Sequence, residues 1–311
     1  MPGDVLDGRW KVLERIGYGS SGSVFQGEDL KEDRQVAIKL LAPDHCRRPD
    51  AIARFEREAR VLTTLQHPNL VRLLGLGKRG EVPYIVMEFL EGITLERHRQ
   101  HRRGSLHLLE TLRITQQICG ALDFLHRNDI VHRDVKPQNL FIGPKGRATL
   151  LDLGVVRDLA APALTLPGAM VGTPYYMAPE QTRVEAKIDR RTDVYAMAAV
   201  VFELLTGRPP FDGRSNFEVL HAHRNTPPPD ACAQVPAIPP AAGALLKRAL
   251  AKNAAERPPT AGVFLAELEA ALGLDDERTH EELHPPSFEE EPGPEEPTTL
   301  EELPDGALPK G

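Results

Sequence analysis

The run HRDVKPQN, from His132 to Asn139, is followed thirteen residues later by Asp152, and together these residues carry groups suited to phosphoryl transfer. Moving a γ-phosphoryl group to a hydroxyl requires positioned cations and a group that orients the attacking oxygen. Asp134 can accept the proton, and Lys136 can reach the same phosphate as a point charge. Asn139 and Asp152 offer the hard oxygen ligands that Mg²⁺ prefers. The sequence therefore predicts a catalytic group of Asp134, Lys136 and Asn139 beside a metal site.

A glycine-rich segment near the N-terminus has the pattern G-x-G-x-x-G-x-V, from Gly17 through Gly19 and Gly22 to Val24. Because glycine has no Cβ, the backbone N–H groups of such a turn can approach phosphate oxygens. The segment follows an apolar stretch ending at Ile16, so we expect a strand, a turn and a second strand. Alone, the pattern would more often be a chance glycine-rich turn, and its weight comes from the motifs that follow it.

An apolar run, Val36-Ala37-Ile38-Lys39, ends in a lysine that we expect to be buried. A buried lysine is costly unless it is paired, and holding the ATP phosphates is the role that fits it. The alternative is an edge-strand lysine that points into water. An amphipathic helix is expected from residue 51 to 65, because apolar residues recur there at spacings of three and four. It offers Glu56 and Glu58 as partners for Lys39.

These motifs, in this order, resemble the protein-kinase family, and in particular the bacterial eukaryotic-like (Hanks-type) serine/threonine kinases. The resemblance covers residues 9–272. It implies an α+β, bilobal protein-kinase fold, with a small strand-rich N-lobe that carries one helix (9–89) and a larger, mainly helical C-lobe (92–272). Of the two candidate glutamates, Glu58 matches the residue that pairs with the lysine in similar kinases.

The resemblance also implies a nucleotide site between the lobes. The hinge would lie at Met87 to Leu90, with its backbone binding adenine and Met87 gating the deeper pocket. The implied ATP-binding residues are Ile16, Gly17, Gly19, Gly22, Val24, Ala37, Lys39, Glu58, Met87, Glu88, Leu90 and Leu140.

Downstream, the segment from residue 172 to Glu180 resembles the part of the family that shapes the groove for the substrate peptide. Glu180 would be buried, and a buried carboxylate requires a partner. Arg257 matches the arginine that fills this role in similar kinases. Asp193 matches the aspartate that binds the backbone of the catalytic loop.

The implied function is an active protein serine/threonine kinase, with ATP and Mg²⁺ as cofactors, Mn²⁺ as an alternative metal, and proteins as substrates. Lys136 and Thr173 favour serine/threonine over tyrosine specificity. Leu153 replaces the commoner Phe after the expected metal ligand Asp152. We expect this replacement to shift the balance of inactive states and not to abolish activity. The alternative is a pseudokinase or scaffold. Such a protein would normally lack one of the residues that bind the metal or the phosphates, and none of these residues is missing here. A small-molecule phosphotransferase rarely needs the 172–180 segment.

Regulation by phosphorylation is expected at Thr165. Thr165 and Thr173 are the only threonines between residues 152 and 180, which contain no serine. Phosphate would add about −1.5 to −2 charge and could bridge Arg133 to Arg157, which would order the loop. A loop that is ordered without phosphate is the alternative.

An acidic segment follows the predicted domain, and we expect residues 273–311 to be disordered. Residues 274–311 contain thirteen acidic and two basic residues, a net of −11, whereas the whole chain has −7. Within this tail, Thr298 and Thr299 could recruit a phosphopeptide-binding domain after autophosphorylation; an inert spacer is the favoured alternative.

The cysteine content and the hydropathy of the sequence favour a cytoplasmic protein. Three widely spaced cysteines argue against a disulfide framework. We expect no membrane span in this chain and no nucleic-acid binding. A basic cluster (Arg97, Arg99, Arg102, Arg103) is expected to be a solvated helix face or, alternatively, a dock for acidic substrates.

Overall fold

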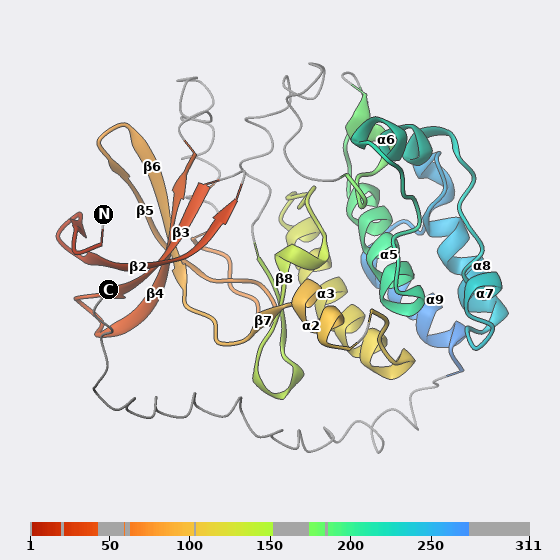
Figure 1. The fold of residues 1–311 in the computed structure, drawn as a ribbon, viewed down its shortest axis with the longest axis horizontal. Helices are drawn as coiled ribbons and strands as arrows, with labels where there is room; N and C mark the ends of the chain where they lie inside the picture. The colour runs from red at the N-terminus through yellow and green to blue at the C-terminus, as the bar shows by residue number, and fades with distance from the viewer. Residues whose placement is uncertain are drawn as a thin grey trace, which may run out of the picture.

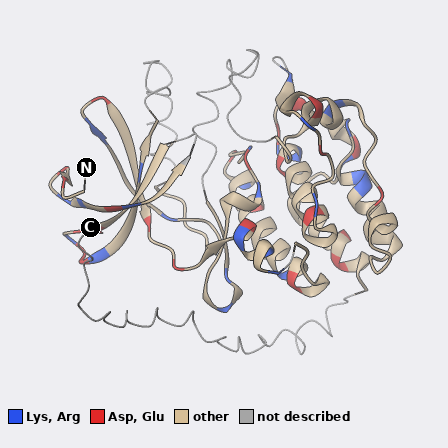
Figure 2. Cartoon of the chain, viewed as in Figure 1, with Lys and Arg blue, Asp and Glu red and all other residues tan. Residues whose placement is uncertain are grey.

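The structure, a computed structural model, describes residues 2–19, 22–42, 59, 63–102, 104–151, 174–183 and 186–273. Strands gather in one part of the molecule and helices in the other, with β7 and α2 lying between them (Figure 1). Basic and acidic residues both occur in the strand-rich part and in the helical part (Figure 2). This arrangement agrees with the predicted division into a strand-rich N-lobe and a helical C-lobe.

The N-lobe is built on one antiparallel sheet with the strand order β1-β2-β3-β4-β6-β5. Its strands are β1 (Val5–Leu6), β2 (Trp10–Gly19), β3 (Gly22–Asp29), β4 (Arg34–Leu41), β5 (Leu73–Arg79) and β6 (Val82–Glu88). Because side chains alternate between the faces of a strand, β4 sends Val36 and Ile38 to one face and Ala37 and Lys39 to the other. Val36 and Ile38 belong to a buried cluster that includes Trp10. The opposite face, with Ala37 and Lys39, is therefore the one left for a ligand.

The C-lobe combines a small sheet, β7-β8-β9, with a bundle of helices. Its elements are β7 (Ile93–Thr94), α2 (Leu95–His101), α3 (Leu108–Arg127), η2 (Pro137–Asn139), β8 (Leu140–Ile142), η3 (Pro144–Gly146), β9 (Ala148–Leu150), η6 (Pro179–Thr182), α5 (Arg191–Thr206), α6 (Asn216–Asn225), α7 (Ala231–Gln234), α8 (Pro240–Ala249), η7 (Ala254–Glu256) and α9 (Ala261–Ala271). Residues 192–205 of α5 are all buried. A helix that is apolar on every side belongs in a core, and α5 is the central helix around which the lobe packs.

The helix expected over residues 51–65 lies largely outside the described residues, together with Glu56 and Glu58. Ala59 is described as helical and is fully buried. The Thr63 N–H donates to the Ala59 carbonyl at 3.1 Å, the i→i−4 bond of a helix. Leu65 already lies outside a helix, so the end of this element comes before the predicted end.

The basic cluster on α2 is not the uniformly solvated face that we expected. Arg97 and Arg102 are exposed, and Arg103 lies outside the described residues. The Arg99 side chain, by contrast, is only 17% exposed and forms an ion pair with Glu203 at 3.0 Å. The stem of Arg99 is packed against the lobe because a carboxylate of α5 holds its charged end.

Among the helices of the described ranges, none combines the length and the apolar character that crossing a membrane requires.

Candidate active site

The structure brings Asp134, Lys136 and Asn139 into direct contact. The Lys136 Nζ donates to the Asp134 Oδ2 at 2.8 Å. The Asn139 Nδ2 donates to the same carboxylate oxygen at 2.9 Å and to the Asp134 backbone carbonyl at 2.8 Å. The Asp134 side chain remains 16% exposed, so it can still meet a substrate. This loop therefore presents a fixed carboxylate whose charge is balanced by an adjacent ammonium group.

The backbone of the catalytic loop is held by Asp193 at the start of α5. Its Oδ2 accepts a hydrogen bond from the His132 N–H, and its Oδ1 accepts one from the Arg133 N–H, both at 2.8 Å. Asp193 is fully buried, and the His126 ring contacts its Oδ2 at 2.8 Å. Arg133 has φ = 66°, a conformation that side-chain-bearing residues rarely adopt. The two bonds from Asp193 hold the loop in this turn, immediately before Asp134.

A second set of contacts joins the catalytic loop to the end of β9. The fully buried His132 contacts the Leu151 carbonyl through Nε2 at 2.9 Å and accepts a hydrogen bond from the Asp134 N–H through Nδ1 at 3.2 Å. The Leu151 N–H donates to the Asn139 carbonyl at 2.7 Å. Leu151 directly precedes Asp152, which lies outside the described residues. The chain is thus tied to the catalytic loop up to the residue before the second predicted metal ligand.

The N-lobe sheet places the predicted phosphate-binding residues in one row. The register pairs Gly17 with Val24, and Val24 with Lys39, on three adjacent strands. Lys39 is only 4% exposed, which excludes the alternative of a lysine pointing into water. Gly22 has φ = +139°, and a Cβ there would collide with the Leu40 carbonyl. Glycine is therefore required where the hairpin closes against β4.

The hinge residues lie beside the small sheet of the C-lobe. Ala37 pairs with Met87 across β4 and β6, on the same face as Lys39. Glu88 and Leu90 line a cavity of about 370 Å³ together with Phe141. Ile16, at the other side of the predicted site, is 49% exposed.

Leu140 differs from the position that we expected for an ATP contact. It is fully buried in the main hydrophobic core, whereas its neighbour Phe141 faces the hinge cavity. The reason is the alternation of side chains along β8, which sends Leu140 and Ile142 inward and leaves Phe141 on the hinge side. Neither Ala37 nor Lys39 lines that cavity, so the exposure of Phe141 on the hinge side does not assign it to the predicted ATP site.

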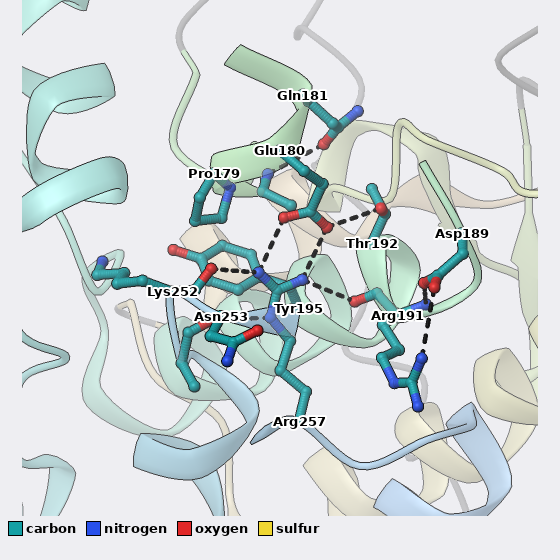
Figure 3. Close-up of polar contacts among 12 residues, drawn as sticks. Pro179, Glu180, Gln181, Asp189, Arg191, Thr192, Tyr195, Lys252, Asn253 and Arg257 are labelled. Atoms are coloured by element: carbon teal, nitrogen blue, oxygen red, sulfur yellow. Dashed lines mark hydrogen bonds and ion pairs between the residues drawn. The ribbon is translucent and has the colours of Figure 1, made fainter. Parts of the chain in front are cut away.

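Glu180 and Arg257 form the buried pair that the sequence suggested (Figure 3). The guanidinium donates to both carboxylate oxygens, at 2.7 and 2.9 Å, and the Thr192 hydroxyl adds a bond to Glu180 at 2.8 Å. Arg257 also donates to the carbonyls of Ala251 and Arg191, at 2.8 and 3.1 Å. Burial raises the pKa of Glu180, but the hydrogen bonds and charge of Arg257, together with the bond from Thr192 and a backbone hydrogen bond, hold the pKa below its usual value.

Tyr176 of the groove segment and Gln181, which directly follows the segment, were not singled out from the sequence. Gln181 donates to the Arg133 carbonyl at 2.8 Å and accepts from the Ala178 N–H at 3.0 Å, so it joins the segment to the catalytic loop. Tyr176 lines a small cleft together with Asp134. A single polar residue carries no periodic signal, so only the three-dimensional structure identifies these two contacts.

A divalent metal fits the described part of this site. Asn139 is 6% exposed, and both of its side-chain hydrogen bonds use the amide nitrogen. Its oxygen Oδ1, the atom that a metal would take, is not committed to either bond. Within the described residues, no three His, Cys, Asp or Glu side chains gather as a metal site. Glu58, Thr165, Arg157 and the tail threonines Thr298 and Thr299 lie outside those residues.

Comparison with known proteins identifies the family. Residues 10–267 match the protein kinase domain. The chain is 37% identical over 273 residues to the serine/threonine-protein kinase PrkC of Bacillus subtilis, covering 88% of this chain and 42% of PrkC. It is 36% identical over 269 residues to the serine/threonine-protein kinase PknB of Mycobacterium tuberculosis, covering 85% of this chain and 43% of PknB. The chain thus spans less than half the length of these relatives.

A solved structure supports the same assignment. The PknI kinase domain of M. tuberculosis superimposes with a TM-score of 0.73 at 27% identity, covering 88% of this chain and 99% of that domain. The predicted bilobal fold and the predicted protein kinase family are therefore confirmed. The chain belongs to the protein kinase family and, within it, is similar to the bacterial serine/threonine kinases.

Proposed function

We propose that this chain transfers the γ-phosphoryl group of ATP to serine or threonine hydroxyls of proteins. The observation that carries the proposal is the fixed Asp134 carboxylate, held by Lys136 and Asn139 in a cleft that the groove segment also lines. An acceptor hydroxyl in that cleft would donate its proton to Asp134. Lys136, 2.8 Å from the carboxylate, lies where it can meet the same transferred phosphate.

The other residues hold ATP and metal. Lys39 would bind the α- and β-phosphates, with Glu58 as its partner, and the hinge backbone would bind adenine. Asn139 and Asp152 would hold Mg²⁺, with Mn²⁺ as an alternative. When bound, the metal neutralises negative charge on the phosphates. The chain's own residues do the remaining work, which is to orient the hydroxyl and take its proton at Asp134.

Lys39→Met is the variant that tests the nucleotide half of this proposal. Methionine has a similar length, so the packing of the buried site is kept while the charge is removed. We expect transfer of labelled γ-phosphate to a generic basic protein to fall by at least about 10²-fold, because positioning and electrostatics carry most of phosphoryl-transfer catalysis. The wild-type reaction should require a divalent metal.

Lys11→Met, in strand β2 of the same sheet, is the matched control because the Lys11 side chain is 44% exposed. It should keep wild-type transfer. A wild-type protein that binds ATP but transfers no phosphate would favour the pseudokinase or scaffold alternative. Phosphorylation of small molecules but not of proteins would favour a small-molecule phosphotransferase.

Thr165 is our proposed site of autophosphorylation, bridging Arg133 and Arg157. Mass spectrometry of the protein incubated with ATP should find phosphate on Thr165, and Thr165→Ala should lower activity severalfold, because loss of the phosphate removes about −1.5 to −2 charge from the loop. Thr165→Ser is the control, since it keeps the acceptor hydroxyl. A fully active enzyme that carries no phosphate would contradict the proposal.

We also propose protein partners and a cytoplasmic location for this chain. Protein substrates follow from the proposed activity, and phosphorylated Thr298 or Thr299 could recruit a phosphopeptide-binding domain through charge-assisted hydrogen bonds. A cytoplasmic location suits an enzyme that uses ATP and carries three widely spaced cysteines.

A further inference from the structure

The peptide unit between Arg133 and Asp134 is held from both sides by side chains. The Asp134 N–H donates to the His132 Nδ1 at 3.2 Å, and the Arg133 carbonyl accepts a hydrogen bond from the Gln181 Nε2 at 2.8 Å. Because a trans peptide unit is planar, its N–H and C=O point in opposite directions, so the two bonds together fix its plane. The orientation of this plane determines the direction in which the Asp134 side chain leaves the backbone.

Gln181 holds a part of the catalytic loop that Asp193 does not reach. Asp193 accepts hydrogen bonds from the N–H groups of His132 and Arg133, which belong to the two preceding peptide units. Arg133 has φ = 66°, and a residue with a side chain keeps such a conformation only where its surroundings hold it. The bond from Gln181 to the Arg133 carbonyl supplies the next restraint along the chain, immediately before Asp134.

The side-chain amide of Gln181 is suited to this contact because it is both a donor and an acceptor. While Nε2 donates to the Arg133 carbonyl, Oε1 accepts a hydrogen bond from the Ala178 N–H at 3.0 Å. A reversed amide would place its oxygen against the carbonyl oxygen and its NH2 group against the N–H, so the two contacts define one orientation. An ionised glutamate has only acceptors and a lysine only donors, so neither could make both bonds.

The backbone of Gln181 is anchored to the C-lobe. Gln181 lies in η6, and its N–H donates to the Ala178 carbonyl at 3.0 Å. The preceding residue, Glu180, is held by Arg257 through two hydrogen bonds, and Gln181 lies directly beside it (Figure 3). Gln181 therefore contacts the catalytic loop from a fixed point at the end of the groove segment.

We propose that Gln181 is a positioning residue for catalysis, which orients the Asp134 carboxylate through the Arg133 carbonyl. This inference rests on the proposed kinase activity and adds a residue that neither the catalytic loop nor the nucleotide site includes. Gln181 acts through the backbone and not on the reacting atoms, so its effect falls on the rate of the transfer step. ATP would bind to the N-lobe sheet and the hinge, and its affinity does not depend on this bond.

Gln181→Met tests the inference in the full chain, by steady-state kinetics with peptide and ATP varied separately. Methionine has a similar length but cannot donate to the carbonyl. We expect kcat to fall by on the order of tenfold to a hundredfold, because misplacing a catalytic group by about 1 Å can cost a hundredfold. The KM for ATP should stay within about twofold of wild type. Gln100→Met is the matched control, since Gln100 is an exposed glutamine of α2, and it should leave kcat unchanged.

A second experiment separates positioning from a general loss of structure. In the Asp134→Asn background, the carboxylate that Gln181 orients is absent. Gln181→Met should therefore lower the residual kcat of that background by less than about twofold, because the effects of residues that act through one group do not add. A general loss of structure would lower kcat by the same factor in both backgrounds.

Gln181→Glu keeps the inference testable if Gln181→Met does not fold. Its carboxylate retains an acceptor for the Ala178 N–H but places an oxygen against the Arg133 carbonyl oxygen. We expect kcat to fall at least as far as in Gln181→Met, again with the KM for ATP unchanged.

Three outcomes would overturn the inference. The first is a wild-type kcat in the Gln181 variants, the second is a KM for ATP that rises in step with the loss of kcat, and the third is an undiminished effect in the Asp134→Asn background. Failure of the proposed function itself gives a different result, because the wild-type protein would then transfer no phosphate to any peptide.

Discussion

Asp134→Asn is expected to remove most phosphoryl transfer while ATP binding remains. Asparagine keeps the shape of the side chain and can still contact Lys136 and Asn139, so the loop should retain its fold. It cannot take the proton of an acceptor hydroxyl. We expect kcat to fall by about 10²–10⁴-fold, the usual contribution of a positioned general base. Transfer of labelled phosphate to a peptide, alongside a direct ATP-binding measurement, checks both parts.

The control for this variant is Asp129→Asn. Asp129 is exposed, precedes the catalytic loop and has φ = 59°, a conformation that asparagine tolerates as well as aspartate. Its substitution should leave both measurements unchanged. Near wild-type peptide phosphorylation by Asp134→Asn would remove the catalytic assignment, even if ATP binding were intact.

Arg257→Leu is expected to be the most destabilising of the substitutions considered for this chain. It leaves the Glu180 side chain, which is only 11% exposed, with the Thr192 hydroxyl as its one side-chain donor among the described residues, and Arg257 itself is 3% exposed. Breaking a buried ion pair by removing one partner costs about 3–5 kcal/mol. Urea unfolding of the purified protein should show this loss as a lower transition midpoint at unchanged slope.

Arg248→Leu provides the contrast. Its side chain is 48% exposed and pairs with Glu267, which is 39% exposed. Exposed ion pairs contribute about 0–1 kcal/mol, so this variant should unfold near the wild-type midpoint. Equal losses in the two variants would contradict the role that we assign to the Glu180–Arg257 pair.

The same pair predicts how stability depends on pH. The pKa of Glu180 in the folded protein lies below its unfolded value, so its contribution is fully present above the unfolded pKa and is lost as pH falls through the folded pKa. In Arg257→Leu, burial alone would raise the pKa of Glu180. The contribution of Glu180 to the stability of that variant should therefore increase as pH falls through the raised folded pKa towards the unfolded pKa of glutamate, the opposite direction from wild type, which unfolding curves at several pH values can measure.

The parts of the site that could be predicted from the sequence are those in which several residue types must occur at fixed spacing. Asp134, Lys136 and Asn139 share one short loop, so local spacing determines their contact. Gly17, Val24 and Lys39 lie on successive hairpin strands, where turn position and alternation determine the register. Such local relations carry a signal that can be recognised without the fold.

Contacts between elements that are far apart in the sequence were harder to predict. Arg99 and Glu203 are 104 positions apart, and nothing in the pattern of α2 distinguishes Arg99 from the exposed Arg97. Leu140 and Phe141 are both apolar, and only the pairing of β8 with β7 and β9 fixes which of them faces the hinge cavity. The burial of one arginine among several depends on helix rotation, which the sequence alone determines poorly.

The anchoring of the catalytic loop has a consequence for how the enzyme opens and closes. The contacts described for this loop include those from Asp193, from Gln181, from the end of β9 and from the loop itself, all within one lobe. Lys39, by contrast, is carried by β4 of the other lobe. A hinge movement can therefore change the separation of Lys39 and Asp134 while the catalytic loop keeps its shape. In the proposed reaction, nucleotide exchange would then require no rearrangement of the catalytic loop, and lobe opening with product release would be the step that limits turnover.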